Sequence, residues 1–175
     1  ESNLELRDKI ENNIGNYRIE LEDIKVEIEK QREDLVAVKE KQFVRPPAFN
    51  VHSPTNHIPA NNEVIVYKVQ LLNEGEGYDI TTGVFTAPTA GLYMFAAHMC
   101  NYNGQYMHYG IVVEDSLVAS SVQGDSVLYS CSSVNAVVRV NKGGRVYVKC
   151  TADNSVQAIY SDKYRWNSFN GILLH

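Results

Sequence analysis

This sequence lacks the features that mark a membrane protein or a nucleic-acid-binding protein. None of its apolar runs approaches the ~20 residues that a helix needs to cross a bilayer, and no signal-peptide pattern is present. Its 16 Lys and Arg are outnumbered by 21 Asp and Glu, and neither half of the chain is strongly basic. We therefore expect no nucleic-acid partner and no membrane span.

Catalytic motifs are also missing. The chain has no Gly-x-Ser-x-Gly elbow, no Walker loop and no His-Glu-x-x-His segment. Residues 46–175 contain only nine Asp and Glu, and no two of them are spaced to act as an acid and base pair. The sequence predicts a protein that is not an enzyme.

Cysteine is scarce, with Cys100, Cys131 and Cys150 the only three. They cannot all pair within one chain, and their spacing matches no zinc or redox motif. Either one disulfide forms beside a free or intermolecular thiol, or all three are buried as small apolar residues, which we favour. His98 and Cys100 would share one face of a strand, but without further spaced ligands we favour core packing, and we predict no metal and no cofactor.

Charge divides the chain into two parts. Residues 1–45 hold 21 Asp, Glu, Lys and Arg, whereas the following 130 residues hold only 16. Pro46 and Pro47 follow directly and prevent a helix from continuing. We expect a helical segment at 1–45 and a separate globular unit at 46–175.

The helical segment carries a heptad repeat that only Gln31 interrupts in its centre. A period of 3.5 residues over about five heptads predicts a coiled coil roughly 50 Å long. The alternative is an amphipathic helix that packs on its own domain. The predicted oligomerisation seam consists of Ile10, Ile14, Tyr17, Leu21, Ile24, Ile28, Leu35 and Val38.

Charges beside the seam predict how the helices are oriented. Acidic side chains occupy successive g positions and basic side chains successive e positions, so parallel chains attract while antiparallel chains repel. Each exposed pair contributes only about 0.3–0.5 kcal/mol, and β-branched d positions favour three or more chains over two. The segment is thus predicted to be a parallel trimerisation stalk. The pairs are Glu20 with Lys25, Glu27 with Arg32, and Asp34 with Lys39.

From Ala48 onward the apolar period changes to two residues. Short Val-, Ile- and aromatic-rich segments bounded by turn residues are typical of an antiparallel sandwich. Residues 138–148 predict a hairpin around Lys142-Gly143-Gly144. The predicted strands are 63–71, 91–99, 108–114, 135–141, 145–150, 156–161 and 168–174.

Residues 73–95, "NEGEGYDITTGVFTAPTAGLYMF", and the closing "FNGILL" resemble the globular head of complement C1q and its relatives in the C1q/tumour necrosis factor superfamily. The resemblance covers 47–175. It implies an all-β head, a ten-stranded antiparallel jelly-roll sandwich, at 46–175, and a homotrimer about a central axis that is secreted and extracellular. The matching positions are Asn73, Tyr78, Asp79, Gly83, Phe85, Pro88, Gly91, Tyr93, Phe95, Phe169, Gly171 and Leu173.

The sequence departs from the family at a few positions. Tyr67 stands where Phe is usual and Ala97 where an aromatic residue is usual, and we expect both to affect only core packing. Gly144 replaces the acid of the family's Lys-Gly-Asp turn, so the sequence does not support calcium binding. No collagen-like repeat is present, and the coiled coil takes its place, as in many invertebrate C1q-domain proteins.

Two loops are candidates for carbohydrate binding, 100–109 and 161–168. Aromatic rings suit sugar faces, and a guanidinium can bind the carboxylate of an acidic sugar. Alternatively, Tyr164 or Trp166 packs between protomers or caps the sandwich. His52 and His57 flank a further loop and are expected to be exposed. The predicted ligand contacts are Tyr102, Tyr106, His108, Tyr164, Arg165 and Trp166.

The resemblance implies a trimeric, lectin-like pattern-recognition protein of innate immunity that binds glycans or microbial surfaces through its heads, with assembly beyond the trimer left open. Two alternatives stand beside it. One is a signalling ligand of tumour necrosis factor type that binds receptors in the clefts between protomers. The other is a structural protein of extracellular matrix or biomineral, which the low acid content of the head disfavours.

Overall fold

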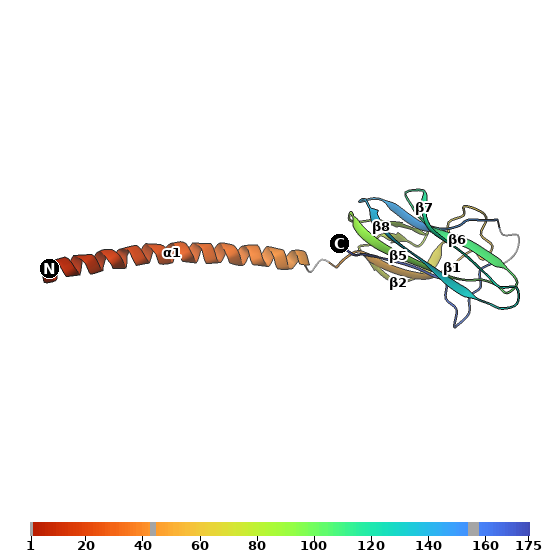
Figure 1. The fold of residues 1–175 in the computed structure, drawn as a ribbon, viewed down its shortest axis with the longest axis horizontal. Helices are drawn as coiled ribbons and strands as arrows, with labels where there is room; N and C mark the ends of the chain where they lie inside the picture. Colours follow the sequence, from red (N-terminus) through yellow and green to blue (C-terminus); the bar gives the residue numbers. More distant parts are fainter. Residues whose placement is uncertain (1, 43–44, 154–157) are drawn as a thin grey trace. The chain divides into compact units, whose positions relative to one another are not determined.

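The computed structural model describes residues 2–42, 45–153 and 158–175, and the chain divides into two compact units, Glu1–Val44 and Arg45–His175 (Figure 1). The first unit contains the helix α1, Asn3–Gln42. The described part of the second unit forms ten strands. The strands are β1 Ala48–Pro54, β2 Tyr67–Glu74, β3 Tyr78–Asp79, β4 Val84–Thr86, β5 Gly91–Cys100, β6 Tyr106–Val113, β7 Ser116–Gly124, β8 Cys131–Val140, β9 Arg145–Cys150 and β10 Ser168–Leu173.

The helix α1 begins with a capping box. Ser2 Oγ accepts from the Glu5 amide at 3.4 Å, and Glu5 Oε2 accepts from the Ser2 amide at 2.9 Å, which satisfies two of the amides that a helix leaves unpaired at its start.

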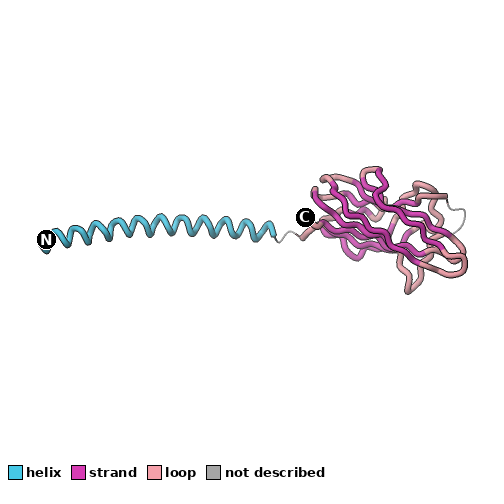
Figure 2. The backbone as a smooth tube through the Cα atoms, in the orientation of Figure 1, coloured by secondary structure: helices cyan, strands magenta, loops and turns pink. Residues whose placement is uncertain are grey.

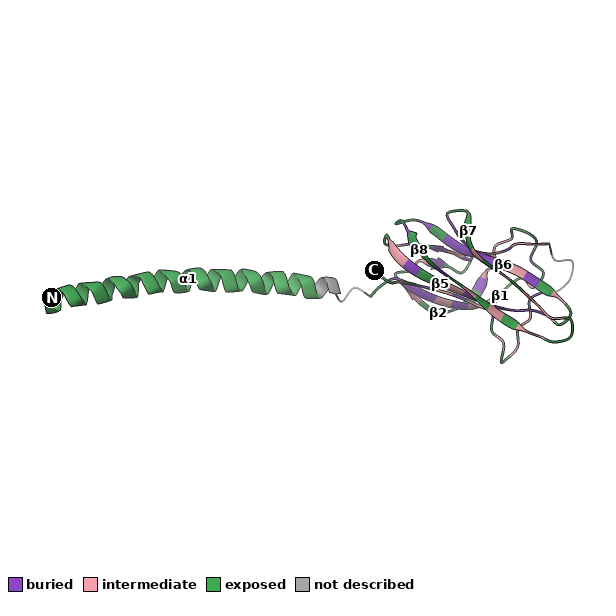
Figure 3. Cartoon of the chain, viewed as in Figure 1, coloured by how far each residue is buried: buried purple, intermediate pink, exposed green. Residues whose placement is uncertain are grey.

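No described helix is long and apolar enough to cross a membrane. Side chains from Asn3 to Lys39 are exposed in the single chain (Figure 3), so the coiled coil, which needs further chains, stays a prediction.

The second unit is a sandwich of two five-stranded antiparallel sheets (Figure 2). The strand order is β2-β1-β10-β5-β8 in the first sheet and β3-β4-β9-β6-β7 in the second. This arrangement confirms the predicted ten-stranded jelly roll.

The topology corrects two predictions about single segments. The predicted hairpin at 138–148 is wrong, because β8 and β9 belong to different sheets and the turn between them carries the chain from one sheet to the other. The predicted strand at 156–161 is not formed within its described part. There, Ile159 makes a single bridge to Asn101, and residues 156–157 lie outside the described residues.

Aromatic side chains fill the space between the sheets. Alternation along β5 turns Tyr93 and Phe95 inward, and both are fully buried. The ring of Phe49 lies 4.8 Å from those of Phe85 and Phe169. The rings approach the backbone so closely that a Cβ atom at Gly171 would lie 2.5 Å from Phe95 Cδ1. The positions that carry the family resemblance in β5 and β10 therefore build the core.

Candidate functional site

Three loops meet at one end of the head. The ten-residue strand β5 starts beside the C-terminus, where the Leu92 amide donates to the His175 carbonyl at 2.8 Å, and it ends at Cys100. Just beyond that end, the Asn101 amide donates to the Ser130 carbonyl at 2.9 Å and the Tyr102 amide to the Ala158 carbonyl at 2.8 Å. Segments 101–105, 125–130 and 158–167 therefore share the end of the sandwich opposite the C-terminus, which we call the loop end.

Two buried asparagines hold these loops together. Asn101 donates to the carbonyls of Tyr102 and Gln105, at 2.8 and 2.9 Å, and its Oδ1 accepts from the Ser130 amide at 3.0 Å and the Ser130 hydroxyl at 2.8 Å. Asn167 Oδ1 accepts from the Cys100 amide at 2.6 Å. Both side chains are fully buried, so breaking these bonds would leave polar groups unpaired.

Within this end, three tyrosine rings and an arginine form a cluster. The ring of Tyr160 lies 4.1 Å from Tyr129 and 5.8 Å from Tyr102. The Arg165 guanidinium lies 5.5 Å from the Tyr129 ring and 5.8 Å from the Tyr160 ring, within the range of a cation–π contact. We call Tyr102, Tyr129, Tyr160 and Arg165 the tyrosine cluster. All four side chains are half-exposed.

The arginine of the cluster already has an anionic partner. Arg165 Nη1 lies 2.6 Å from Asp162 Oδ2. Asp162 Oδ1 accepts from the amides of Tyr164 and Arg165, each at 2.8 Å. Chiefly because of the Tyr164 amide, the pKa of Asp162 is below its usual value, so this carboxylate stays charged. Partial burial raises the pKa of Tyr129, which keeps the phenol neutral.

The other predicted contacts lie outside the tyrosine cluster. Trp166 stacks on His52, with ring centroids 4.4 Å apart, and is 50% exposed. His52 and His57 are both predicted to be exposed, but both are half-buried. Tyr164 is 79% exposed and has Lys163 Nζ 4.7 Å from its ring centroid.

Tyr106 and His108 belong to the strand β6 rather than to a loop. Their neighbours Met107 and Tyr109 are fully buried, so alternation turns Tyr106 and His108 to the outer side of the second sheet. The structure thus brings Tyr102 and Arg165 together, whereas Tyr106 and His108 lie on another surface.

Sequence reasoning missed Tyr129 and Tyr160. Tyr160 falls in a segment predicted as a strand, and Tyr129 lies just before β8. Both join the site through contacts between loops that are distant in sequence. The sequence around each of them contains no motif that would predict a binding site.

The cysteines form one disulfide, between Cys100 and Cys131, so the favoured prediction of three buried thiols is wrong for these two. They face each other across β5 and β8, which places the bridge beneath the loop end. Cys150 is fully buried, and its Sγ donates to the Ala152 carbonyl at 2.9 Å. The prediction of a buried thiol is confirmed for Cys150.

Comparisons with known proteins agree with this architecture. The profile of the C1q domain matches residues 48–174. A mussel protein, "Heavy metal-binding protein HIP" of Mytilus edulis, is 24% identical over 167 residues, which cover 95% of this chain and 76% of the relative.

Two solved structures share the fold of the head. The globular domain of zebrafish complement 1qA superimposes with a TM-score of 0.57 at 19% identity, over 74% of this chain and 98% of that domain. Murine APRIL, solved at pH 5.0, superimposes with a TM-score of 0.58 at 14% identity, over 74% of this chain and 100% of that chain. At these identities the likeness concerns the fold alone.

Proposed function

This chain belongs to the C1q-domain family, and from that membership we propose that it is a secreted homotrimer whose heads bind carbohydrate on glycans or microbial surfaces. C1q-domain proteins are generally secreted binding proteins rather than enzymes, and C1q-like and tumour necrosis factor-like domains generally form trimers.

The observation that carries the proposal is the tyrosine cluster. Its three rings lie at a loop end, where binding chemistry can change without disturbing strand packing. Half-exposed phenols offer flat apolar faces to sugar C–H groups and hydroxyls that hydrogen-bond. Asn103 and Gln105, in the adjoining loop, supply further amides for sugar hydroxyls.

The ion pair of Arg165 with Asp162 changes the expected ligand. A sugar carboxylate would have to compete with a carboxylate that already lies 2.6 Å from the guanidinium. Asp162 would also repel an acidic sugar, because its lowered pKa keeps it ionised. We therefore propose neutral sugars as the ligands of the cluster.

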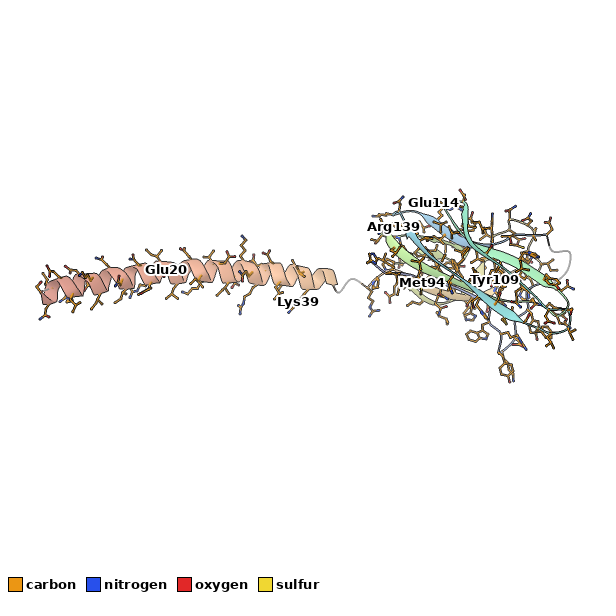
Figure 4. All side chains as sticks on the ribbon, in the orientation of Figure 1. Glu20, Lys39, Met94, Tyr109, Glu114 and Arg139 are labelled. Atoms are coloured by element: carbon orange, nitrogen blue, oxygen red, sulfur yellow. A yellow bond between two sulfur atoms is a disulfide. The ribbon has the colours of Figure 1, made fainter. Side chains whose placement is uncertain are left out.

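Trimer formation would give these heads their avidity. The seam of α1 supports a parallel trimer, and in the head Met94 pairs laterally with Ile172 on one side and Val137 on the other, with all three side chains exposed on the outer face of the first sheet (Met94 is labelled in Figure 4). Such an apolar row is typical of a surface that another protomer covers. Three heads on one stalk turn weak single-site binding into strong attachment.

A glycan array probed with the intact trimer tests the proposal. Tyr129→Leu and Tyr160→Leu remove rings of the cluster, and Tyr106→Leu is the matched control, an exposed tyrosine on the outer side of the second sheet. We expect each cluster variant to lose about tenfold in signal, since a lost ring contact is worth about 0.5–1.5 kcal/mol per site and avidity amplifies it. The control should bind normally.

Two results would contradict the proposal. An array that shows no signal for intact trimer would remove carbohydrate as the ligand class. Full binding by both cluster variants, with loss in Tyr106→Leu, would move the site to the outer side of the second sheet.

A further inference from the structure

Three potential metal ligands lie together on the outer face of the first sheet. His98 and Cys100 are two residues apart on β5, and Cys131 is the cross-strand partner of Cys100 on β8, the neighbouring strand in Figure 1. One donor atom from each side chain lies within 4.8 Å of the others. Two rigid, paired strands therefore hold one nitrogen and two sulfurs in a compact group.

The imidazole of His98 is already positioned by a neighbour. Its Nδ1 lies 2.8 Å from the Ser133 hydroxyl, the residue directly opposite on β8. Its Nε2 lies 3.6 Å from Cys100 Sγ. When Nδ1–H donates to the Ser133 oxygen, the lone pair of Nε2 faces the sulfur, which is the arrangement that a hydrogen bond from the other ring nitrogen imposes on metal-binding histidines.

The distance between nitrogen and sulfur also fits a metal ion. Ligands at ~2.3 Å for sulfur and ~2.1 Å for nitrogen around a tetrahedral zinc ion are about 3.6 Å apart. His98 Nε2 and Cys100 Sγ have this separation without any movement. Only Cys131 Sγ must rotate away from Cys100 Sγ once the bond between them opens.

We propose that His98, Cys100 and Cys131 form a redox-gated site for a thiophilic divalent cation such as Zn²⁺ or Cd²⁺. Two molecules of a low-molecular-weight thiol reduce the disulfide, giving two cysteine thiols and one external disulfide. The cation then binds two thiolates and the neutral imidazole and releases two protons. Three protein ligands leave a fourth position for solvent. The oxidised chain has no thiolate here and does not bind the cation.

The two sulfurs differ in access, which sets the order of the reduction. Cys131 is exposed, whereas Cys100 is fully buried. An incoming thiolate therefore attacks Cys131 Sγ, and Cys100 leaves as the first protein thiolate. The backbone of Cys100 stays fixed, because its amide donates to Asn167 Oδ1 at 2.6 Å and its carbonyl accepts from the Tyr160 amide at 3.0 Å.

The test uses the full chain, oxidised or reduced with dithiothreitol and then freed of it without oxygen. Titration with Co²⁺ should give thiolate charge-transfer absorption and tetrahedral d–d bands that saturate at one ion per chain in the reduced protein only. Zn²⁺ or Cd²⁺ should displace them. His98→Gln should weaken binding at least tenfold, and Ser133→Ala should weaken it less. His108→Gln, a half-buried histidine on the other sheet, is the matched control and should bind normally.

A second measurement distinguishes a loss of metal binding from a loss of the fold on reduction. Circular dichroism should show that Zn²⁺ raises the melting temperature of reduced wild-type protein, but not that of oxidised protein or of reduced His98→Gln. Equal binding by the oxidised chain, absence of stoichiometric binding after reduction, or loss of the cobalt bands in Cys150→Ala would each overturn the assignment.

Discussion

The hydroxyl of Tyr78 serves both backbone groups of Tyr67. It accepts from the Tyr67 amide at 3.2 Å and lies 3.4 Å from the Tyr67 carbonyl, to which it donates. The hydroxyl of Tyr67 itself is buried and has no hydrogen-bond partner among the described residues. The two tyrosines are neighbours in the same core, but their hydroxyls contribute in opposite directions.

Replacing these tyrosines by phenylalanine should therefore change stability with opposite signs. Tyr67→Phe removes an unsatisfied hydroxyl and should leave the free energy of unfolding unchanged or raise it by up to about 1 kcal/mol. Tyr78→Phe leaves the buried Tyr67 amide unpaired and should lower it by about 1–3 kcal/mol. Urea unfolding measures both. Destabilisation by Tyr67→Phe equal to that by Tyr78→Phe would contradict this assignment.

The same pair predicts loss of stability in alkali. Burial raises the pKa of Tyr78 to about 12 and that of Tyr67 well above its ordinary value. An unfolded tyrosine ionises near ~10, so above that pH the unfolded chain gives up protons that the folded chain keeps. The stabilisation is complete below pH ~10 and falls by up to about 1.4 kcal/mol per pH unit for each such tyrosine as pH rises towards 12.

Urea unfolding between pH 8 and 12 measures this effect. Tyr67→Phe should reduce the alkaline slope, because it removes one of the two ionisable groups. An identical slope in wild type and variant would assign the effect to other groups.

Loss of the disulfide should lower the stability of the head considerably. The bridge joins residues 31 positions apart, and closing a loop of that length contributes about 4 kcal/mol in the chain-entropy description. We expect Cys100→Ser with Cys131→Ser to lower the free energy of unfolding by about 2–4 kcal/mol in urea. Reduced wild-type protein without metal is the control and should behave alike; a loss below about 1 kcal/mol would contradict the prediction.

Charge reversal at the g positions of α1 should weaken assembly of the stalk. The variant would place base against base across every interface of a parallel coil. Sedimentation equilibrium should show a wild-type trimer and weakened association in the variant. Mixing with chains reversed at the e positions should restore association. The g substitutions are Glu20→Lys, Glu27→Lys and Asp34→Lys, and the e substitutions are Lys25→Glu, Arg32→Glu and Lys39→Glu.

A control with the same change in net charge reverses acids away from the seam. These are Glu22, Glu29 and Glu33, each changed to Lys. Equal loss of association in control and g variant would assign the effect to net charge, and an unaffected g variant would refute the parallel pairing.

Gly171 should tolerate no side chain. A Cβ atom there would lie 2.5 Å from Phe95 Cδ1 and 2.6 Å from Phe49 Cε1, both core rings. We expect Gly171→Ala to lower the free energy of unfolding of the head by about 1–3 kcal/mol. Gly15→Ala, on α1 with no atom outside its own stretch of helix backbone within 4 Å of its Cβ position, should instead raise helix stability by up to about 1 kcal/mol. Similar melting temperatures for Gly171→Ala and wild type would disprove the crowding.

Local alternation was enough to predict the core. Tyr93 and Phe95 are buried because every second residue of β5 faces inward, and that period is visible in the sequence. The failed hairpin at 138–148 has the same local pattern as a true one. Long-range packing decides whether β9 pairs with β8 or crosses to β6, and the turn residues between β8 and β9 do not predict that choice.

The candidate site was only partly predictable for the same reason. Tyr102 and Arg165 could be selected as aromatic and cationic loop residues, but their convergence depends on which strands are neighbours. Tyr129 enters through the pairing of β5 with β8, and so does the disulfide, which the count of cysteines left open. Tyr129 is distant in sequence from the other residues of the tyrosine cluster, and Cys131 is distant in sequence from Cys100.

The position of β1 has a mechanical consequence. The chain enters the head at Arg45 and becomes an interior strand of the first sheet, between β2 and β10, with the Pro47 carbonyl also accepting from the Leu173 amide at 2.9 Å. If a ligand is held at the loop end, as we propose, tension on the chain at Arg45 acts along the axis of β1. Its hydrogen bonds run across the strand, so tension along the strand loads them together in shear instead of breaking them one after another. The pairing of β1 on both of its sides therefore opposes extraction of this strand when the chain is pulled at Arg45.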